Sequence, residues 1–118
     1  MPAFEVWSVV KVPFPYSDRP IRQRRPALVV ARTPALLKPR LLWVLMITSA
    51  RHRRWPGDVE IADPGAAGLP APSIVRTAKI AAIEELSAET IGLLSGAEQH
   101  AVQEELASIL RTALYRTG

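Results

Sequence analysis

Two short segments place arginine and hydroxyl side chains at the ends of apolar runs, where strands can hold them rigidly near solvent. Arg24-Arg25-Pro26 comes directly before the run Ala27–Ala31, and Thr48-Ser49 directly follows the run Leu41–Ile47. Arginine presents parallel N–H donors and keeps its charge at any cellular pH. Threonine adds a hydroxyl on a stiff β-branched side chain. Side chains of these types suit the binding of a phosphate group.

Other catalytic patterns are absent from the sequence. The chain has no cysteine and two histidines, which excludes thiolate catalysis, disulfides and Cys-built zinc sites and argues against a histidine metal centre. It contains no GxxxxGK[ST] loop, no GxGxxG, no HExxH and no GxSxG. We therefore expect neither a metal site nor a cofactor.

Charge is distributed unevenly along the chain. The net charge is +4, but ten basic side chains between Arg19 and Arg54 are uninterrupted by acidic ones. Residues 80–118, in contrast, hold six glutamates and two arginines. This pattern favours a surface that binds a polyanion, with the acidic end turned away from it. A solvated basic surface without a ligand is the alternative.

The composition and the proline distribution predict one small domain, residues 1–118, of mainly β (α+β) fold. Of the 118 residues 48% are hydrophobic and 22% charged, which is typical of a globular protein. All 11 prolines lie within residues 1–72, so strands and loops should come first and helix last. We expect a strongly curved β-barrel of about five to seven strands with a C-terminal α-helix. The expected strands are Val6–Val12, Ala27–Ala31, Leu41–Ile47, Val59–Ile61 and Ser73–Ile83, the last being one strand or two.

Two helices are expected near the end of the chain. Ser87 can cap a short helix that runs to Leu94. Ser95 and Glu98 fit a capping box, in which Ser accepts from an early backbone N–H and Glu reaches back. Apolar residues then recur at helical spacing and predict a core-facing stripe: Val102, Leu106, Ile109 and Ala113.

No segment is long enough to cross a membrane. The longest clean apolar run, Leu41–Ile47, has seven residues, far fewer than the roughly 20 that a membrane span needs. No signal peptide is apparent at the N-terminus. We expect a cytoplasmic protein, and we expect Trp43, within that apolar run, to belong to the core.

Four segments of the chain form an ordered set of motifs: KVPFPYSD (11–18), RRPALVV (24–30), MITSA (46–50) and GLPAPSIVRTAKI (68–80). They resemble the MazF/PemK family of toxin endoribonucleases, the stable partners in type II toxin–antitoxin pairs, over nearly the whole chain. The resemblance implies an SH3-like barrel, a homodimer and metal-independent cleavage of single-stranded RNA. It also implies a cognate antitoxin whose acidic, flexible segment covers an arginine-lined groove.

The resemblance assigns roles to individual residues. In that family the arginine before the RP-motif proline and the threonine that ends the ITS strand form the active-site pair, which are Arg25 and Thr48 here. Arg76 matches a position that is a candidate acid in PemK-like members. Ala78, however, stands where those members have an aspartate, so the base is left open.

Two further residues are candidates for catalysis or phosphate contact. His52 could carry a proton, because imidazole exchanges protons near neutral pH; a merely solvated loop histidine is the alternative. Ser49, next to Thr48, is the other candidate.

RNA contacts are expected from the two basic loops. Arg51, Arg53 and Arg54 should follow the RNA backbone more than read bases. Tyr16, in Phe14-Pro15-Tyr16, and Trp55 could stack on bases, although Phe14 could instead pin its loop to the barrel. The remaining candidates are Arg22, Arg24 and Lys79.

Two other function classes stay open at this point. A barrel of the same kind can bind a protein target such as DNA gyrase without catalysis, because one fold hosts many functions. A non-toxic nucleic-acid-binding regulator would need only the basic loops. The sequence departs from the family at its start, where Trp7-Ser8 stands in place of the usual Gly-Asp.

Overall fold

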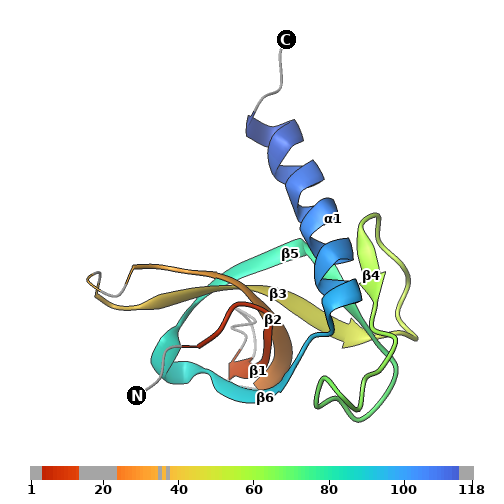
Figure 1. Cartoon of the computed structure of the whole chain (residues 1–118), viewed down its shortest axis with the longest axis horizontal. Helices are drawn as coiled ribbons and strands as arrows, with labels where there is room; N and C mark the ends of the chain where they lie inside the picture. Colours follow the sequence, from red (N-terminus) through yellow and green to blue (C-terminus); the bar gives the residue numbers. More distant parts are fainter. Residues whose placement is uncertain (1–3, 14–23, 35, 37, 115–118) are drawn as a thin grey trace, which may run out of the picture.

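The computed structural model describes residues 4–13, 24–34, 36 and 38–114, which form a curved β-sheet followed by a helix (Figure 1). The described sheet has the order β4-β5-β3-β2-β1-β6 with every pair antiparallel. Its strands are β1 (Ser8–Pro13), β2 (Arg24–Arg32), β3 (Leu41–Ser49), β4 (Asp58–Glu60), β5 (Ser73–Glu84) and β6 (Glu89–Leu93). The 3-10 turn η1 (Glu85–Ser87) joins β5 to β6, and α1 (Gly96–Leu114) follows. The expected mainly β fold with a C-terminal helix is confirmed.

Strand β3 is the centre of the core because it is buried on both faces, as its continuous apolar run predicts. Leu45 and Ile47 belong to one buried cluster, which also receives Val102 from α1. Val44 and Met46 belong to a second cluster, made with side chains of β1 and β2. Alternate residues of β3 therefore hold two apolar layers together.

The edge strand β6 contacts the β4–β5 connection where two glycines allow the backbones to approach closely. A Cβ on Gly92 of β6 would lie 2.2 Å from the carbonyl oxygen of Ala67, and one on Gly68 would lie 2.0 Å from the carbonyl oxygen of Ile91. Residues 61–72, which connect β4 to β5, thus pack directly against β6. A side chain at either glycine would push the two segments apart.

The prediction of a helix between Ser87 and Leu94 is wrong. Residues 85–87 form only the turn η1, and Glu89–Leu93 is strand β6, paired with β1 through Val10↔Thr90 and Lys11↔Glu89. β-Branched Thr90 and Ile91 suit a strand, and the unpaired edge of β1 supplies the partner. Long-range pairing decided between two locally acceptable structures.

Helix α1 begins after Ser95, as predicted, but Glu98 makes a different set of contacts from a capping box. The Ser95 hydroxyl donates to Glu98 Oε1 at 2.8 Å, and the backbone N–H of Ala62 donates to Glu98 Oε2. Glu98 is 8% exposed. Its carboxylate therefore ties the start of the helix to the segment that follows β4.

The apolar stripe of α1 is core for only half its length. Val102 is fully buried and Leu106 packs against the same cluster, but Ile109 is 39% exposed. Figure 1 shows why: the C-terminal half of α1 projects beyond the sheet.

The expectation that Trp43 belongs to the core is wrong. Trp43 is 47% exposed, because it lies near the start of β3, away from the helix contacts around Val102. No helix within the described part of the chain is long and apolar enough to span a membrane.

Trp7 adopts a backbone conformation that glycine normally supplies. Its φ is +78°, in the left-handed region. The backbone N–H of Trp7 donates to the Val29 carbonyl at 2.7 Å, and the Trp7 carbonyl accepts from the backbone N–H of Leu94 at 3.0 Å. The indole packs against the buried cluster of Val102. These contacts hold a residue that stands where the resembling family usually has glycine, and β1 accordingly begins at Ser8 and not at Val6.

Candidate active site

Arg25 and Thr48 lie on the same face of the sheet, each just beyond the last pair between β2 and β3. The pairing of these two strands ends at Ala27↔Met46. Arg25 is two residues before Ala27, Thr48 is two residues after Met46, and side chains two residues apart on a strand point to the same face. Both side chains therefore belong to the end of the face that carries Met46.

His52 contacts Thr48 directly. Thr48 Oγ1 and His52 Nδ1 lie 2.5 Å apart, and the ring tautomer decides which of them donates. A turn after β3 fixes the histidine, because its backbone N–H donates to the Ser49 carbonyl at 3.1 Å. His52 is exposed whereas Thr48 is half-buried. A hydroxyl at the strand end is thus linked to an imidazole that reaches solvent.

Arg76 lies on the same sheet face as Thr48 but is engaged inside the protein. It pairs with Met46, which lies two residues before Thr48 on β3, and the Arg76 side chain is 10% exposed. Its guanidinium donates to both carboxylate oxygens of Asp58, at 3.4 and 3.3 Å, and to the carbonyl of Arg53 at 2.6 Å. Its Cζ also lies 4.2 Å from the centroid of the Trp55 ring. These contacts fit a residue that positions the loop more than one that meets a phosphate.

Asp58 is the residue that the sequence reasoning missed. Its side chain is 2% exposed, and besides Arg76 it accepts the backbone N–H of Trp55 at 2.8 Å. The hydroxyl of Thr77 donates to the Gly57 carbonyl at 2.8 Å and adds a second tie to the same loop. The one available signal was a single acidic residue at the end of the basic segment Arg51–Gly57.

Residues 5–110 match the family model described as PemK-like, MazF-like toxin of type II toxin–antitoxin system. The chain belongs to this family. No curated protein sequence matches it.

Solved structures show that this PemK/MazF-like chain has the MazF fold. MazF of Deinococcus radiodurans superposes with a TM-score of 0.70 at 23% identity, covering 93% of this chain and 98% of that one. A mycobacterial endoribonuclease, solved in complex with its cognate antitoxin, gives 0.68 at 18% identity, with 93% and 95% covered. The Mycobacterium tuberculosis toxin MazF-mt6 gives 0.65 at 21%, with 87% and 95% covered. At these identities the likeness concerns the fold.

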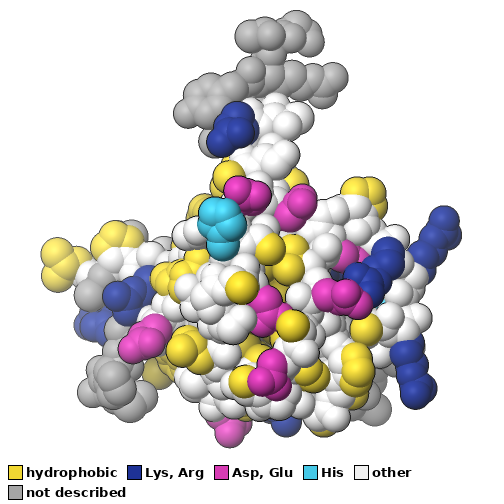
Figure 2. All heavy atoms as spheres, turned by 45° about the vertical axis from the view of Figure 1, so that its right-hand side comes forward, with side chains coloured by type: hydrophobic (Ala, Val, Ile, Leu, Met, Phe, Trp, Pro, Cys, Tyr) yellow, Lys and Arg dark blue, Asp and Glu magenta, His cyan; other side chains and the backbone are white. Residues whose placement is uncertain are grey.

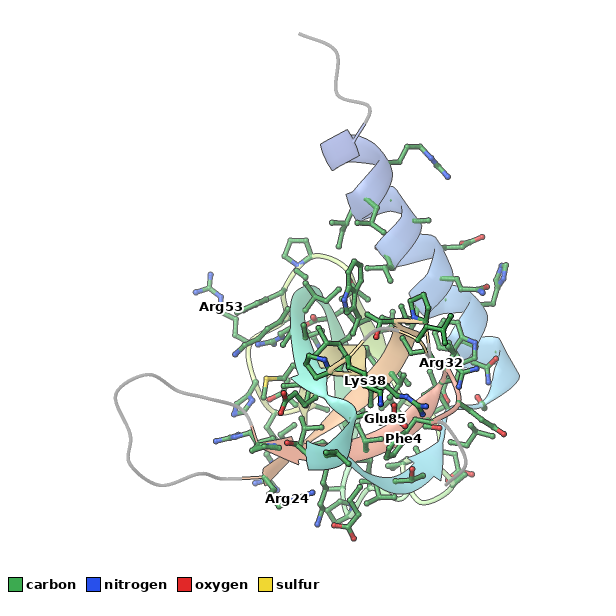
Figure 3. All side chains as sticks on the ribbon, turned by 90° about the vertical axis from the view of Figure 1, so that its left-hand side faces the viewer. Phe4, Arg24, Arg32, Lys38, Arg53 and Glu85 are labelled. Carbon is green, nitrogen blue, oxygen red and sulfur yellow. The ribbon has the colours of Figure 1, made fainter. Side chains whose placement is uncertain are left out.

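Exposed arginines follow Thr48 in the loop between β3 and β4 of the PemK/MazF-like protein. Figure 1 places the segment between β3 and β4 at one edge of the molecule, and Lys and Arg side chains project from that flank in Figure 2. Arg53 points away from the ribbon in Figure 3. Arg51 and Arg53 are exposed, and within the described residues neither forms a salt bridge, whereas Arg54 pairs with Glu60 at 2.8 Å.

Of the other predicted site residues, Ser49, Arg24 and Lys79 belong to the described part of the chain. The Ser49 hydroxyl accepts the backbone N–H of Arg51 at 3.2 Å, so it shapes the turn. Arg24 donates to the carbonyls of Lys11 and Ser87 at 3.2 and 3.3 Å and lies 3.7 Å from Glu89. Lys79 sits in the irregular part of β5 between the pairs Met46↔Arg76 and Leu45↔Ile80. The remaining predictions, Phe14, Tyr16 and Arg22, fall outside the described residues.

Proposed function

We propose that the protein is a metal-independent endoribonuclease toxin that cleaves single-stranded RNA and so inhibits translation and growth. The position of Arg25 and Thr48 on one sheet face, each two residues beyond the pair Ala27↔Met46, carries this proposal. Membership of the PemK/MazF-like toxin family supports it. The exposed Arg51 and Arg53 provide positive charge beside the pair for the RNA backbone.

The chemistry assigned to the pair is attack by the RNA on itself. The 2′-hydroxyl oxygen forms a bond to the adjacent phosphorus while the bond from phosphorus to the 5′-oxygen breaks. The 2′-hydroxyl loses a proton and the leaving 5′-oxygen gains one. The products are a 2′,3′-cyclic phosphate and a 5′-hydroxyl. The Arg25 guanidinium stabilises charge on the non-bridging oxygens through two N–H donors, and the Thr48 hydroxyl adds a neutral hydrogen bond.

The contact between His52 and Thr48 suggests how one of the protons moves. An imidazole within 2.5 Å of the Thr48 hydroxyl can accept or return a proton beside the reacting phosphate. Arginine is a poor proton acceptor, and the guanidinium of Arg76 is engaged by Asp58. We therefore assign proton transfer to His52 and a positioning role to Arg76.

Substitution of His52 by Gln should lower the cleavage rate at least about tenfold and remove one limb of the pH–rate profile. Thr48→Val should lower it by at least about as much, because the hydroxyl is lost. The two effects should not add, since both variants break the same hydrogen bond. An unchanged pH profile for His52→Gln would exclude histidine from proton transfer.

The decisive experiment uses purified protein and a labelled single-stranded RNA with excess EDTA. We expect cleavage to persist and the products to carry 5′-hydroxyl and cyclic phosphate ends. An RNA methylated at every 2′-oxygen should remain intact, because the attacking group is blocked. Binding without cleavage would instead indicate a regulator, and inhibition of DNA gyrase without RNA cleavage would indicate a protein-binding barrel.

We also propose a homodimer and a cognate antitoxin with an acidic, flexible segment. Ile109 and Leu110, on the projecting half of α1, are 39% and 44% exposed, and a second copy would cover them. The acidic segment would neutralise exposed charges such as Arg51 and Arg53. Sedimentation velocity tests the dimer, and a monomer at micromolar concentration would refute it.

A further inference from the structure

Trp55 has one ring face covered by protein and a large exposed area. The Arg76 guanidinium carbon lies 4.2 Å from the ring centroid, which places this cation against one face. The residue is nevertheless 42% exposed. Arg76 is itself only 8% exposed. An exposed tryptophan thus rests on a buried cation.

The loop backbone that carries the indole is held in place before any ligand arrives. The backbone N–H of Trp55 donates to Asp58 Oδ2 at 2.8 Å, and the backbone N–H of Asp58 donates back to the Trp55 carbonyl at 3.1 Å. Arg76 also binds the Arg53 carbonyl at 2.6 Å, so the loop is fixed on both sides of the tryptophan. A preordered ring loses little conformational entropy when a ligand stacks on it.

The residue that contacts the ring lies one strand away from Thr48. Arg76, whose guanidinium contacts the Trp55 ring, pairs with Met46, and Thr48 is two residues further along β3 on the same face. Strand spacing makes the offset between Arg76 and Thr48 about 4.8 Å across the sheet and about 6.8 Å along it. Exposed Arg51 and Arg53 lie in the same loop and can bind flanking phosphates. A nucleotide near the reacting phosphate can therefore reach the ring.

We propose that the open side of Trp55 is a stacking site for one unpaired nucleobase, with the base, the indole and the Arg76 guanidinium forming a continuous stack. This inference rests on the proposed function, in that RNA is the ligand. Unpaired bases have a free face, whereas bases inside a duplex are already stacked. The site thus selects single-stranded over double-stranded RNA at a defined nucleotide.

The test measures binding of a fluorescent, fully 2′-O-methylated single-stranded RNA, which cannot be cleaved, to the full-length protein. Trp55→Ala should weaken binding about 5- to 150-fold, the range expected for loss of one base–aromatic stack. The matched control is Trp43→Ala, which removes another exposed tryptophan, at 47% exposure, from the opposite face of β3, and should bind as the unchanged protein does. The salt dependence of binding should be the same in both variants because no charge is removed.

A scan with single abasic nucleotides separates stacking from a merely structural role. One abasic position should weaken binding to the unchanged protein about as much as Trp55→Ala does, and should have no further effect on that variant. An equal loss of RNA affinity at every abasic position would overturn the proposal, and so would an unchanged affinity in Trp55→Ala. If Trp55→Ala does not fold, Trp55→Leu keeps apolar packing on Arg76 without an aromatic face and replaces it.

Failure of this inference can be distinguished from failure of the nuclease assignment. Selective binding through Trp55 without cleavage of ordinary RNA would leave the stacking site standing and remove the enzyme. Cleavage with unchanged affinity in Trp55→Ala would remove only the stacking site. If the unchanged protein does not bind the methylated RNA at all, the stacking site is refuted regardless of cleavage.

Discussion

Replacement of Arg25 by alanine is expected to reduce RNA cleavage by about 10²–10³, the usual effect of losing one preorganised donor to a developing oxyanion. Arg25 shares a sheet face with Thr48 and is half-buried, and in the proposed mechanism its guanidinium binds the phosphate. The measurement is a single-turnover cleavage rate at saturating protein. Binding of methylated RNA should weaken much less, because the donor acts mainly in the transition state.

Two variants control this prediction. Arg24→Ala removes a neighbouring arginine that is bound to the carbonyls of Lys11 and Ser87, and it should slow cleavage far less. Arg25→Lys keeps the charge but not the paired donors, so it should restore only part of the rate. Near-normal cleavage by a folded Arg25→Ala protein would remove this residue from the active site.

Replacement of Asp58 by alanine is expected to lower the free energy of unfolding by about 3–5 kcal/mol, because it leaves the buried Arg76 charge without its partner. The Asp58 side chain is 2% exposed and that of Arg76 is 10% exposed. The substitution also removes the acceptor for the backbone N–H of Trp55. Urea denaturation followed by far-UV circular dichroism would measure the change. A loss below about 1 kcal/mol would show that water reaches the pair and screens it.

Glu60 provides the matched control for Asp58. It lies on the same short strand and pairs with Arg54 at 2.8 Å, but both side chains are exposed, at 69% and 48%. An exposed ion pair contributes about 0–1 kcal/mol. Glu60→Ala should therefore leave the unfolding midpoint almost unchanged. A similar loss in both variants would show that the charge of β4, and not burial of the pair, stabilises the loop.

Local signals were sufficient for several elements and for the candidate pair. The apolar run Leu41–Ile47 predicts a strand buried on both faces, and β3 is such a strand. The start of α1 after Ser95 follows from a helix-start pattern of four residues. The motifs around Arg25 and Thr48 indicated the candidate pair, which stays a prediction. Each of these signals lies within a short stretch of the chain.

Other features depended on residues far apart in the chain. The segment Glu89–Leu93 became a strand because β1 had an open edge, not because of its own pattern. Trp43 is exposed and Ile109 is not core, because α1 covers only part of the sheet. Hydrophobic periodicity shows which side of an element is apolar, but what covers that side is set by the length and direction of its neighbours.

The chemistry of the basic loop shows the same division. Sequence alone established that arginines, a histidine and a tryptophan follow β3, and this composition predicts a polyanion as the ligand. Folding settled how they are used: Asp58 and Arg76, 18 residues apart, meet in the interior and hold the loop. Residue types set which interactions are possible, whereas burial and register set which partners meet and how strongly each charge is stabilised.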